Sequence, residues 1–167
     1  MTTAVDAVNA GLRNRLTMDI RRAEQVLQVT GPDLRLLLVE DEPFIALDLE
    51  MLVESEGHQV VGVADTFDGA MDMAAVAEPE AAFVDLNLRD GMTGLQVARA
   101  LAQGQGVAVA FITGNAEQIP SDFAGAVAVV EKPFSHEGVT ELLSILEDAR
   151  AGRTTRQPTY ARLAPHA

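Results

Sequence analysis

Short, largely apolar runs recur along this chain, and each of them stops at polar residues. The four clearest runs span residues 34–39, 81–84, 107–112 and 127–130. Runs of this length, bounded by polar or turn residues and separated by helical stretches, are typical of strands buried on both faces of a parallel sheet. The pattern predicts an open α/β fold whose strands all end at one edge, which is where ligands bind in such sheets.

The segments between these runs carry helix signals, so strands and helices are expected to alternate. A further strand is predicted over 59–64, and helices over 43–56, 66–77, 93–102 and 135–149. Pro43 suits a first helical turn, and Gly57 suits a C-terminal cap. Pro120 interrupts the segment 115–123, so the helix expected there should be short or irregular.

The size of the chain agrees with one such domain over residues 32–149. With 167 residues and 48% hydrophobic composition, it can bury a core of its own. It has no cysteine, which excludes disulfides and thiolate metal sites. No apolar segment approaches the roughly 20 residues of a membrane span, and the N-terminus does not resemble a signal peptide. We therefore expect a soluble, cytoplasmic protein that does not enter a membrane.

Acidic side chains are concentrated in the predicted domain. Residues 32–149 hold 22 Asp or Glu against four basic residues, whereas residues 150–167 hold four arginines and no acid. An acidic body repels nucleic acid backbones, so direct nucleic acid binding is not expected. The Arg-bearing tail over 150–167 has no periodicity, and we expect it to be flexible.

Residues 1–31 form an extension before the first predicted strand. From position 5 onward, apolar residues recur at 8, 12, 16, 20, 23 and 27, in steps of three or four. This spacing predicts an amphipathic helix. Such a helix either packs on its own domain or serves as a dimerisation or partner helix, and the sequence leaves both alternatives open.

Polar side chains follow four of the predicted strands, at the shared edge of the sheet. They are Glu40 and Asp41 after the first strand, Asp85 after the third, Thr113 after the fourth and Lys132 after the fifth. Carboxylates held together in this way need a cation between them, and hard oxygen ligands suit Mg²⁺. Asp41 and Asp85 are the candidate direct ligands, and Glu40 would reach the metal directly or through water.

Lys132 is the only lysine of the chain, beside eleven arginines. An ammonium is a compact point charge, so a lysine suits a site where a small anion must be reached. A bound metal, Lys132 and the Thr113 hydroxyl would complement phosphoryl oxygens, and a carboxylate beside them could form an acyl phosphate. Each group alone has an ordinary structural explanation, such as a helix cap or a solvated charge. Their conjunction at four strand ends favours phosphoryl chemistry.

Four motifs at these strand ends resemble the receiver domain of bacterial two-component response regulators, over about residues 34–149. The motifs are Leu37-Leu38-Val39-Glu40-Asp41-Glu42-Pro43, Phe83-Val84-Asp85-Leu86-Asn87-Leu88, Phe111-Ile112-Thr113-Gly114 and Glu131-Lys132-Pro133-Phe134. The resemblance implies a flavodoxin-like fold with a doubly wound, five-stranded parallel sheet. The N-terminal amphipathic helix would be an addition to this fold.

The resemblance also implies roles for the residues at the edge. The implied metal ligands are Glu40, Asp41, Asp85 and the backbone carbonyl of Asn87. Asp85 would be the phosphoacceptor, while Thr113 and Lys132 would contact the phosphoryl group. The bond between Lys132 and Pro133 would be cis, in a tight turn that directs the ammonium inward.

One position departs from the family pattern. Receivers usually have Tyr or Phe on the fifth strand, three residues before the lysine, and this chain has Val129. Valine is too small and too stiff at χ1 to act as a swinging ring. The elements expected to report phosphorylation are therefore the segment 115–123 and the N-terminal helix.

The run over 111–114 further resembles an alphaproteobacterial subfamily named for a Phe-Ala-Thr-Gly motif. Ile112 and Asn115 depart from the fuller pattern of that subfamily. Proteins similar to these are often stand-alone receivers that work with histidine kinases of the HWE or a related class.

These observations predict a single-domain response regulator that is phosphorylated on Asp85 in an Mg²⁺-dependent transfer. The donor would be a histidine kinase or a histidine phosphotransfer protein. The chain would signal by contact with a downstream protein or act as a phosphate shuttle or sink, and would be a phosphoacceptor rather than a turnover enzyme. A homodimer, through the N-terminal helix or through the face formed by helix four, strand five and helix five, is a further alternative.

Two other functional classes fit parts of the pattern. A receiver-like interaction module would have the fold without phosphorylation. A Mg²⁺-dependent phosphohydrolase would use the same carboxylates, but the haloacid dehalogenase pattern requires a second Asp where this chain has Asn87. Acyl-phosphate formation on Asp85 separates the regulator from the unphosphorylated module.

Overall fold

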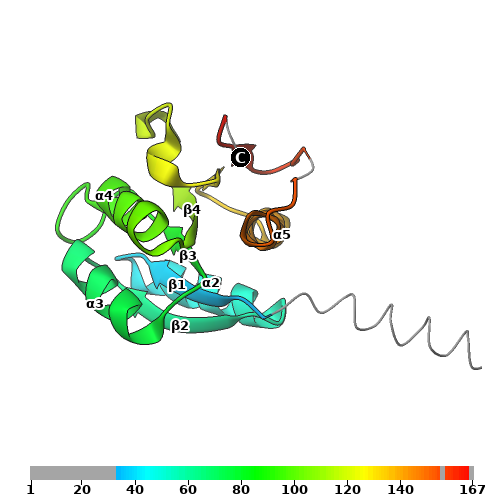
Figure 1. The fold of residues 1–167 in the computed structure, drawn as a ribbon. Coiled ribbons are helices and arrows are strands. Elements are labelled where there is room, and N and C mark those ends of the chain that lie inside the picture. The colour runs from blue at the N-terminus through cyan, green and yellow to red at the C-terminus, as the bar shows by residue number, and fades with distance from the viewer. Residues whose placement is uncertain (1–32, 155–156, 166–167) are drawn as a thin grey trace, which may run out of the picture. The chain divides into compact units, whose positions relative to one another are not determined.

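The computed structural model describes residues 33–154 and 157–165, and Figure 1 shows their fold. The strands are β1 (Arg35–Val39), β2 (Gln59–Ala64), β3 (Ala81–Val84), β4 (Ala108–Thr113), β5 (Ala128–Glu131) and β6 (Arg162–Leu163). The helices are α2 (Pro43–Ser55), α3 (Phe67–Ala77), α4 (Gly94–Arg99) and α5 (His136–Arg150), with the shorter turns η1 (Ala100–Gly104), η2 (Ala116–Gln118) and η3 (Phe123–Gly125). The amphipathic helix predicted over 1–31 lies outside the described residues.

The strands form one sheet in the order β2-β1-β3-β4-β5-β6. Strands β1 to β5 are parallel to one another, which confirms the predicted five-stranded, doubly wound arrangement. The sixth strand is an addition that the sequence does not predict. It is antiparallel to β5, with Leu163 opposite Ala128 and Arg162 opposite Val129.

The segment 157–165 therefore differs from the flexible tail expected over 150–167. It contains β6, and its hydrogen bonds reach residues that lie far away in the sequence. Glu141 of α5 accepts one from Tyr160 N–H, and Ala116 of η2 accepts one from Arg162. A strand of two residues has no periodicity, and contacts with distant residues leave no local pattern, so this order was not predictable from the segment itself.

Helices cover both faces of the sheet. α2 and α5 pack on one face, and α3 and α4 pack on the other (Figure 1). Along β1, Leu37 packs into the α3 and α4 side, whereas Leu36 and Leu38 pack into the α2 and α5 side. Burial on both faces explains why the strand reads as a continuous apolar run. Each buried leucine contributes roughly 1.5–3 kcal/mol to folding.

Helix ends agree with the local signals at most positions. α2 begins at Pro43, and Gly57, with φ of 88°, follows its end. α5 begins after Ser135, whose Oγ accepts a hydrogen bond of 3.1 Å from Gly138 N–H. α4 is shorter than the predicted 93–102, because the chain continues from Ala100 as the π-helical turn η1. Within the described ranges, no helix is both long and apolar enough to cross a membrane.

The segment between β4 and β5 is irregular, as predicted, and contains the single turns η2 and η3. In η3, Phe123 and Ala124 have φ of 51° and 49°, and Gly125 follows with 85°. The left-handed conformation costs a non-glycine residue roughly 1–2 kcal/mol. Surrounding contacts therefore have to hold this turn. One of them is the Asp122 carboxylate, which accepts a hydrogen bond of 3.1 Å from Ala124 N–H.

Candidate functional site

The carboxyl ends of β1 and β3 bring three acidic side chains together. Glu40 and Asp41 follow β1, Asp85 follows β3, and their carboxylate oxygens lie within 4.8 Å of one another. Glu40 is 4% and Asp85 is 7% exposed, whereas Asp41 lies on the surface. Buried carboxylates this close repel each other unless a cation compensates for their charge.

Lys132, which follows β5, provides a cation at this edge. Its Nζ lies 2.8 Å from Glu40 Oε2 and 2.7 Å from Asp85 Oδ2. Glu42 Oε1 lies 3.7 Å away, a contact that the sequence does not predict. The bond between Lys132 and Pro133 is cis, as the family resemblance implies. The only lysine of the chain thus binds both buried carboxylates.

Burial and ion pairing act in opposite directions on the pKa values of the site. Burial raises the pKa of Glu40 above its usual value, although the contact with Lys132 acts against this rise. For Lys132, burial alone would lower the pKa, but hydrogen bonds to Asp85 and Glu40 outweigh it and raise the pKa. Lys132 therefore stays protonated at neutral pH, and Glu40 takes up a proton more readily than an ordinary glutamate.

Both oxygens of the Asp85 carboxylate are held in place. Oδ1 accepts a hydrogen bond of 2.6 Å from Leu86 N–H, and Oδ2 accepts one from Lys132. The start of α4 lies directly against the backbone here, because a Cβ at Gly94 would overlap the carbonyl oxygen of Asp85. A side chain at position 94 would therefore displace the residue that carries the carboxylate. The arrangement presents a fixed carboxylate beside an ammonium, as nucleophilic attack on a phosphoryl group requires.

The donor set at this edge fits Mg²⁺. Hard carboxylate oxygens from Glu40, Asp41 and Asp85 lie close enough to share one ion. The side chain of Asn87 is exposed, and among the described residues no group donates a hydrogen bond to its backbone carbonyl. A hydrogen bond of 2.8 Å from Leu88 N–H to the Gly91 carbonyl closes the turn that follows. The Asn87 carbonyl is thus available as a further oxygen ligand.

Thr113 ends β4 and is fully buried. Its Oγ1 accepts a hydrogen bond of 3.3 Å from Asn115 N–H, and its backbone carbonyl accepts one of 2.9 Å from Lys132 N–H. No hydrogen bond between described residues joins its hydroxyl to Asp85 or to the Lys132 side chain. The backbone thus places Thr113 beside the lysine, while its hydroxyl contacts the turn that follows β4.

Val129 occupies the position where receivers usually have an aromatic ring. It is 2% exposed and lies on β5 between Phe111 of β4 and Arg162 of β6. The neighbouring strand β6 therefore occupies the side of β5 that would otherwise be the free edge of the sheet.

Comparison with protein families identifies the domain that carries this site. Residues 36–144 match the response regulator receiver domain. The chain belongs to this family. Its strand order, its covering helices and its acidic edge are those of a receiver, which confirms the family assignment and the flavodoxin-like fold made from the sequence motifs.

Several relatives are similar to this receiver. Phyllosphere-induced regulator PhyR of Methylorubrum extorquens is 33% identical over 137 residues, which are 77% of this chain and 51% of that protein. The crystal structure of the response regulator PhyR from Brucella abortus has a TM-score of 0.60 and 31% identity, over 74% of this chain and 49% of that one. The solution structure of SdrG from Sphingomonas melonis Fr1 has a TM-score of 0.60 and 35% identity, over 70% of this chain and 98% of that one. The receiver thus spans about half the length of the curated relatives it matches.

Sequence reasoning missed three features of the site. The contact of Glu42 with Lys132 depends on the direction of a side chain at the start of α2. The hydrogen bond from Asn115 N–H to Thr113 depends on the turn that η2 makes. The steric role of Gly94 depends on how closely α4 approaches the residue that follows β3.

Proposed function

We propose that this receiver accepts a phosphoryl group on Asp85 from a phosphohistidine, in a transfer that requires Mg²⁺. The observation that carries the proposal is the buried Asp85 carboxylate, held by the chain's only lysine beside two further acids. A buried ion cluster of this kind contributes little to folding, because the loss of hydration offsets the attraction between the charges. Clusters of buried, interacting charges are instead typical of sites that carry out chemistry.

In the proposed transfer, an oxygen of Asp85 attacks phosphorus and forms a new P–O bond. The bond from phosphorus to the histidine nitrogen breaks, and this nitrogen leaves with the electron pair. Mg²⁺, when bound by Glu40, Asp41, Asp85 and the Asn87 carbonyl, would neutralise charge on the phosphoryl oxygens. Glu40 and Asp41 therefore act by binding and charge balance, and Asp85 acts as the nucleophile.

Lys132 and Thr113 would bind the phosphoryl group once it is on Asp85. The Lys132 ammonium already contacts the accepting carboxylate at 2.7 Å, so a small shift brings it to a phosphoryl oxygen. The Thr113 hydroxyl would donate a hydrogen bond to a second phosphoryl oxygen. To do so, the hydroxyl has to move away from Asn115 N–H, from which it accepts a hydrogen bond in this structure.

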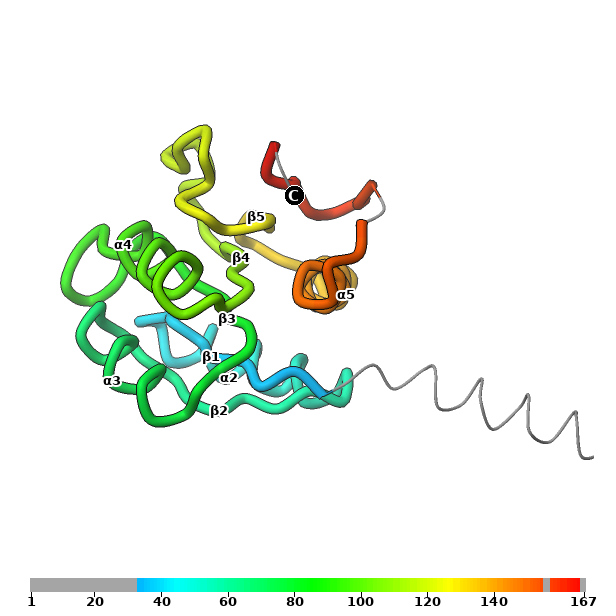
Figure 2. The backbone as a smooth tube through the Cα atoms, in the orientation of Figure 1, coloured from blue at the N-terminus to red at the C-terminus, as the bar shows by residue number. Residues whose placement is uncertain are grey.

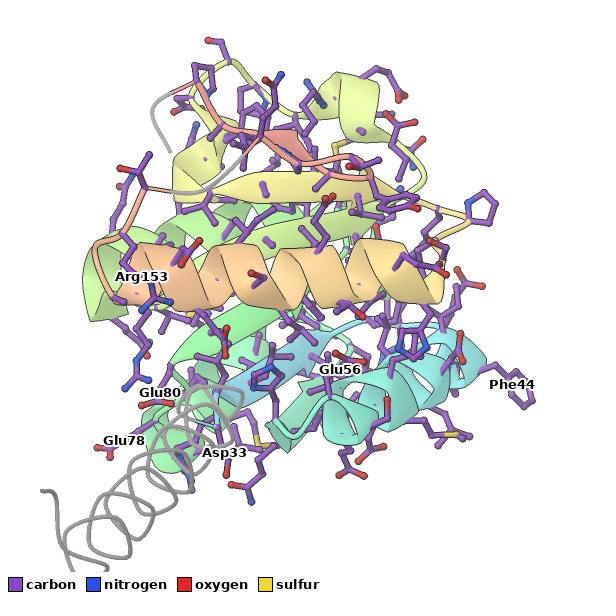
Figure 3. All side chains as sticks on the ribbon, turned by 90° about the vertical axis from the view of Figure 1, so that its right-hand side faces the viewer. Asp33, Phe44, Glu56, Glu78, Glu80 and Arg153 are labelled. Carbon is purple, nitrogen blue, oxygen red and sulfur yellow. The ribbon has the colours of Figure 1, made fainter. Side chains whose placement is uncertain are left out.

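This receiver has an apolar surface next to the site, where a partner protein that carries the phosphohistidine can bind. Phe44, Leu47 and Met51 are exposed on one side of α2, and Phe44 is 88% exposed. Figure 3 shows Phe44 pointing away from the rest of the domain at the start of α2. Large exposed apolar side chains that cluster in this way mark protein contacts. We therefore place a histidine kinase, of the HWE or a related class, or a histidine phosphotransfer protein on this face of α2.

After phosphorylation, the receiver would signal through a downstream protein in the cytoplasm or serve as a phosphate shuttle or sink. PhyR from Bartonella quintana is described as an anti-anti-sigma factor, and an anti-sigma factor is accordingly one candidate partner for this receiver. A homodimer through the N-terminal segment, or through the face that includes β5 and α5, is another candidate. In each case the chain acts as a phosphoacceptor rather than as a turnover enzyme.

The test uses Asp85→Asn in the full chain, with Asp72→Asn as the matched control. Asp72 lies exposed on α3, so its substitution makes the same change of charge away from the acidic edge. With a small phosphodonor and Mg²⁺, we expect the wild type and Asp72→Asn to form a hydroxylamine-sensitive acyl phosphate and Asp85→Asn to form none. A wild type that acquires no label would favour the unphosphorylated interaction module, and a labelled Asp85→Asn would contradict the assignment of the nucleophile.

A further inference from the structure

The segment 157–165 covers the outer side of β5 (Figure 2). Ala164 N–H donates a hydrogen bond of 2.8 Å to the Val127 carbonyl, and β6 pairs with β5 over two residues. Two residues of pairing are few for a strand, and a groove lined by Glu141, Ser144 and Pro158 remains between α5 and the segment. Ala161 and Leu163 also pack against the hydrophobic core, and polar contacts add to this attachment.

One of these contacts is a carboxylate that binds three consecutive backbone groups. Glu141 of α5 accepts hydrogen bonds from Thr159, Tyr160 and Ala161 N–H at 2.6, 2.7 and 2.8 Å. Hydrogen bonds to an ionised group are shorter and stronger than neutral ones. A single acidic side chain thus joins three consecutive backbone groups of the segment to α5.

The second contact joins the segment to the irregular turns after β4. The Arg162 guanidinium donates a hydrogen bond of 3.1 Å from Nη2 to the Ala116 carbonyl of η2. It also lies over the Phe123 ring of η3, 5.2 Å from the ring centroid. A cation over an aromatic face contributes roughly 0.5–1 kcal/mol at an exposed site. One arginine thus contacts both η2 and η3, the turns found in the segment where the sequence predicts a short or irregular helix.

The first of these turns, η2, follows closely after Thr113, whose hydroxyl would move on phosphorylation. Asn115, whose N–H donates to Thr113 Oγ1, precedes Ala116, whose carbonyl binds Arg162. The left-handed residues Phe123 and Ala124 leave η3 under strain, so contacts such as that with Arg162 help to keep it in place. If the Thr113 hydroxyl moved, the hydrogen bond at the start of η2 would be lost, one residue before the carbonyl that Arg162 binds.

We propose that the segment 157–165 is a latch on the outer edge of β5, and that phosphorylation of Asp85 loosens it through Thr113, η2 and Arg162. This inference rests on the proposed function of Asp85. Release of the latch exposes the edge of β5, whose unpaired backbone groups can then pair with an extended segment of a partner protein. The receiver's output surface is therefore covered by its own chain until the phosphoryl group arrives.

The chain contains its own probe for this latch. Tyr160 is the only tyrosine and there is no tryptophan, so tyrosine fluorescence reports the segment 157–165 without a label. We would measure the fluorescence anisotropy of Tyr160 and its quenching by acrylamide in the full chain, with and without beryllofluoride and Mg²⁺. The ¹⁹F resonances of bound beryllofluoride would report occupancy of the site independently.

With the site occupied, we expect the released fraction to rise by roughly five-fold or more, which is the lower end of ordinary allosteric couplings. Thr113→Val, which lacks the hydroxyl that accepts from Asn115 N–H, should release the segment even without beryllofluoride. Arg162→Gln should release it even without beryllofluoride, whereas Arg153→Gln, which removes a contact with Asp148 at 2.7 Å, should behave as the wild type.

Bound beryllofluoride with unchanged Tyr160 anisotropy and quenching would overturn the latch while leaving the phosphoacceptor role intact. A Thr113→Val variant that holds the segment as firmly as the wild type without beryllofluoride would overturn the route through η2. Failure of beryllofluoride to bind at all would count against the proposed function of Asp85 itself, and thus against the basis of the latch.

Discussion

The acidic edge that forms the site and the tail flank beside it are built differently. The acidic edge, made of Glu40, Asp41, Asp85 and Lys132, joins charges from the ends of three regular strands, and Lys132 lies 2.8 and 2.7 Å from the buried carboxylates of Glu40 and Asp85. The tail flank, made of residues 113–125 and 157–165, consists of single turns, two strained non-glycine residues and a two-residue strand. The difference indicates that a rigid edge fixes the reacting groups, while a weakly held flank is free to change when they react.

The first prediction concerns the cation of the acidic edge and has the largest expected effect. Lys132→Met should lower the rate of phosphorylation by about 100-fold or more, because a donor to the transition state is lost. Lys132→Arg should not restore the wild-type rate, since a planar guanidinium cannot bind both carboxylates as an ammonium does. The effects of both substitutions are measured as rates of acyl-phosphate formation with a small phosphodonor.

The control for this prediction is Arg89→Lys, a similar exchange in an exposed pair with Asp65. We expect it to leave the rate unchanged. A wild-type rate in Lys132→Arg would mean that any cation serves at the acidic edge.

The second prediction tests how closely α4 must approach the edge. Gly94→Ala should destabilise the fold by about 1–3 kcal/mol, because its Cβ would overlap the Asp85 carbonyl and the backbone has to shift. Gly104→Ala is the matched control, since a Cβ there would meet no atom within 4 Å and the residue does not have positive φ. Urea unfolding compares the two, and equal stabilities would contradict the close approach.

The third prediction concerns the pH dependence of Mg²⁺ binding. A protonated carboxyl is a poor metal ligand, and burial raises the pKa of Glu40. As the pH is lowered, the Mg²⁺ affinity should therefore begin to fall at a higher pH than it would if Glu40 had the pKa of an ordinary glutamate. It should fall by about tenfold for each pH unit below that pKa, because one proton has to leave. Calorimetric titrations between pH 7 and pH 5 measure this, and they should show a weaker pH dependence for Glu40→Gln.

The fourth prediction has the smallest effect on the chemistry and the clearest effect on the tail flank. Burial would raise the pKa of Glu141, but its hydrogen bonds to Thr159, Tyr160 and Ala161 outweigh burial and lower it. Its stabilising contribution is therefore present above the ordinary pKa of about 4.3 and is lost as the pH falls through the lowered value. Tyr160 should be released in that acidic range.

At neutral pH, Glu141→Gln should increase opening of the segment by about tenfold, because hydrogen bonds to a charged group are replaced by weaker ones. The rate of phosphorylation should stay unchanged. Glu137→Gln, one turn earlier on α5 and exposed, is the control of equal charge. A slower transfer in Glu141→Gln would show that the two regions are not separate.

The acidic edge could be predicted because its information is local. Apolar runs bounded by polar residues place the strand ends, and parallel pairing brings Glu40, Asp85 and Lys132 to one edge whatever the details of packing. The irregular segment before β5 was also predictable, since Pro120 disfavours a helix. The N-terminal segment 1–31 lies outside the described residues, and its dimerisation or packing stays a prediction.

The order of the segment 157–165 and its contacts with η2 and η3 could not be predicted, because they depend on residues that are distant in the sequence. Nothing in the run of residues around Arg162 indicates that it meets Ala116 and Phe123, since those contacts exist only after the sheet has formed. Glu141 is likewise an unremarkable helix residue until three backbone groups meet it. The left-handed turn at η3 depends on the same packing.

The central claim, that the acidic edge carries out phosphoryl transfer on one particular carboxylate, can be tested by locating the acyl phosphate directly. Borohydride reduces a phosphorylated aspartate to homoserine, and mass spectrometry of the digested chain then identifies its position. The account predicts homoserine at position 85 and none at position 41, because Asp85, unlike Asp41, is buried and contacts Lys132. Homoserine at position 41, or label that resists reduction, would contradict it.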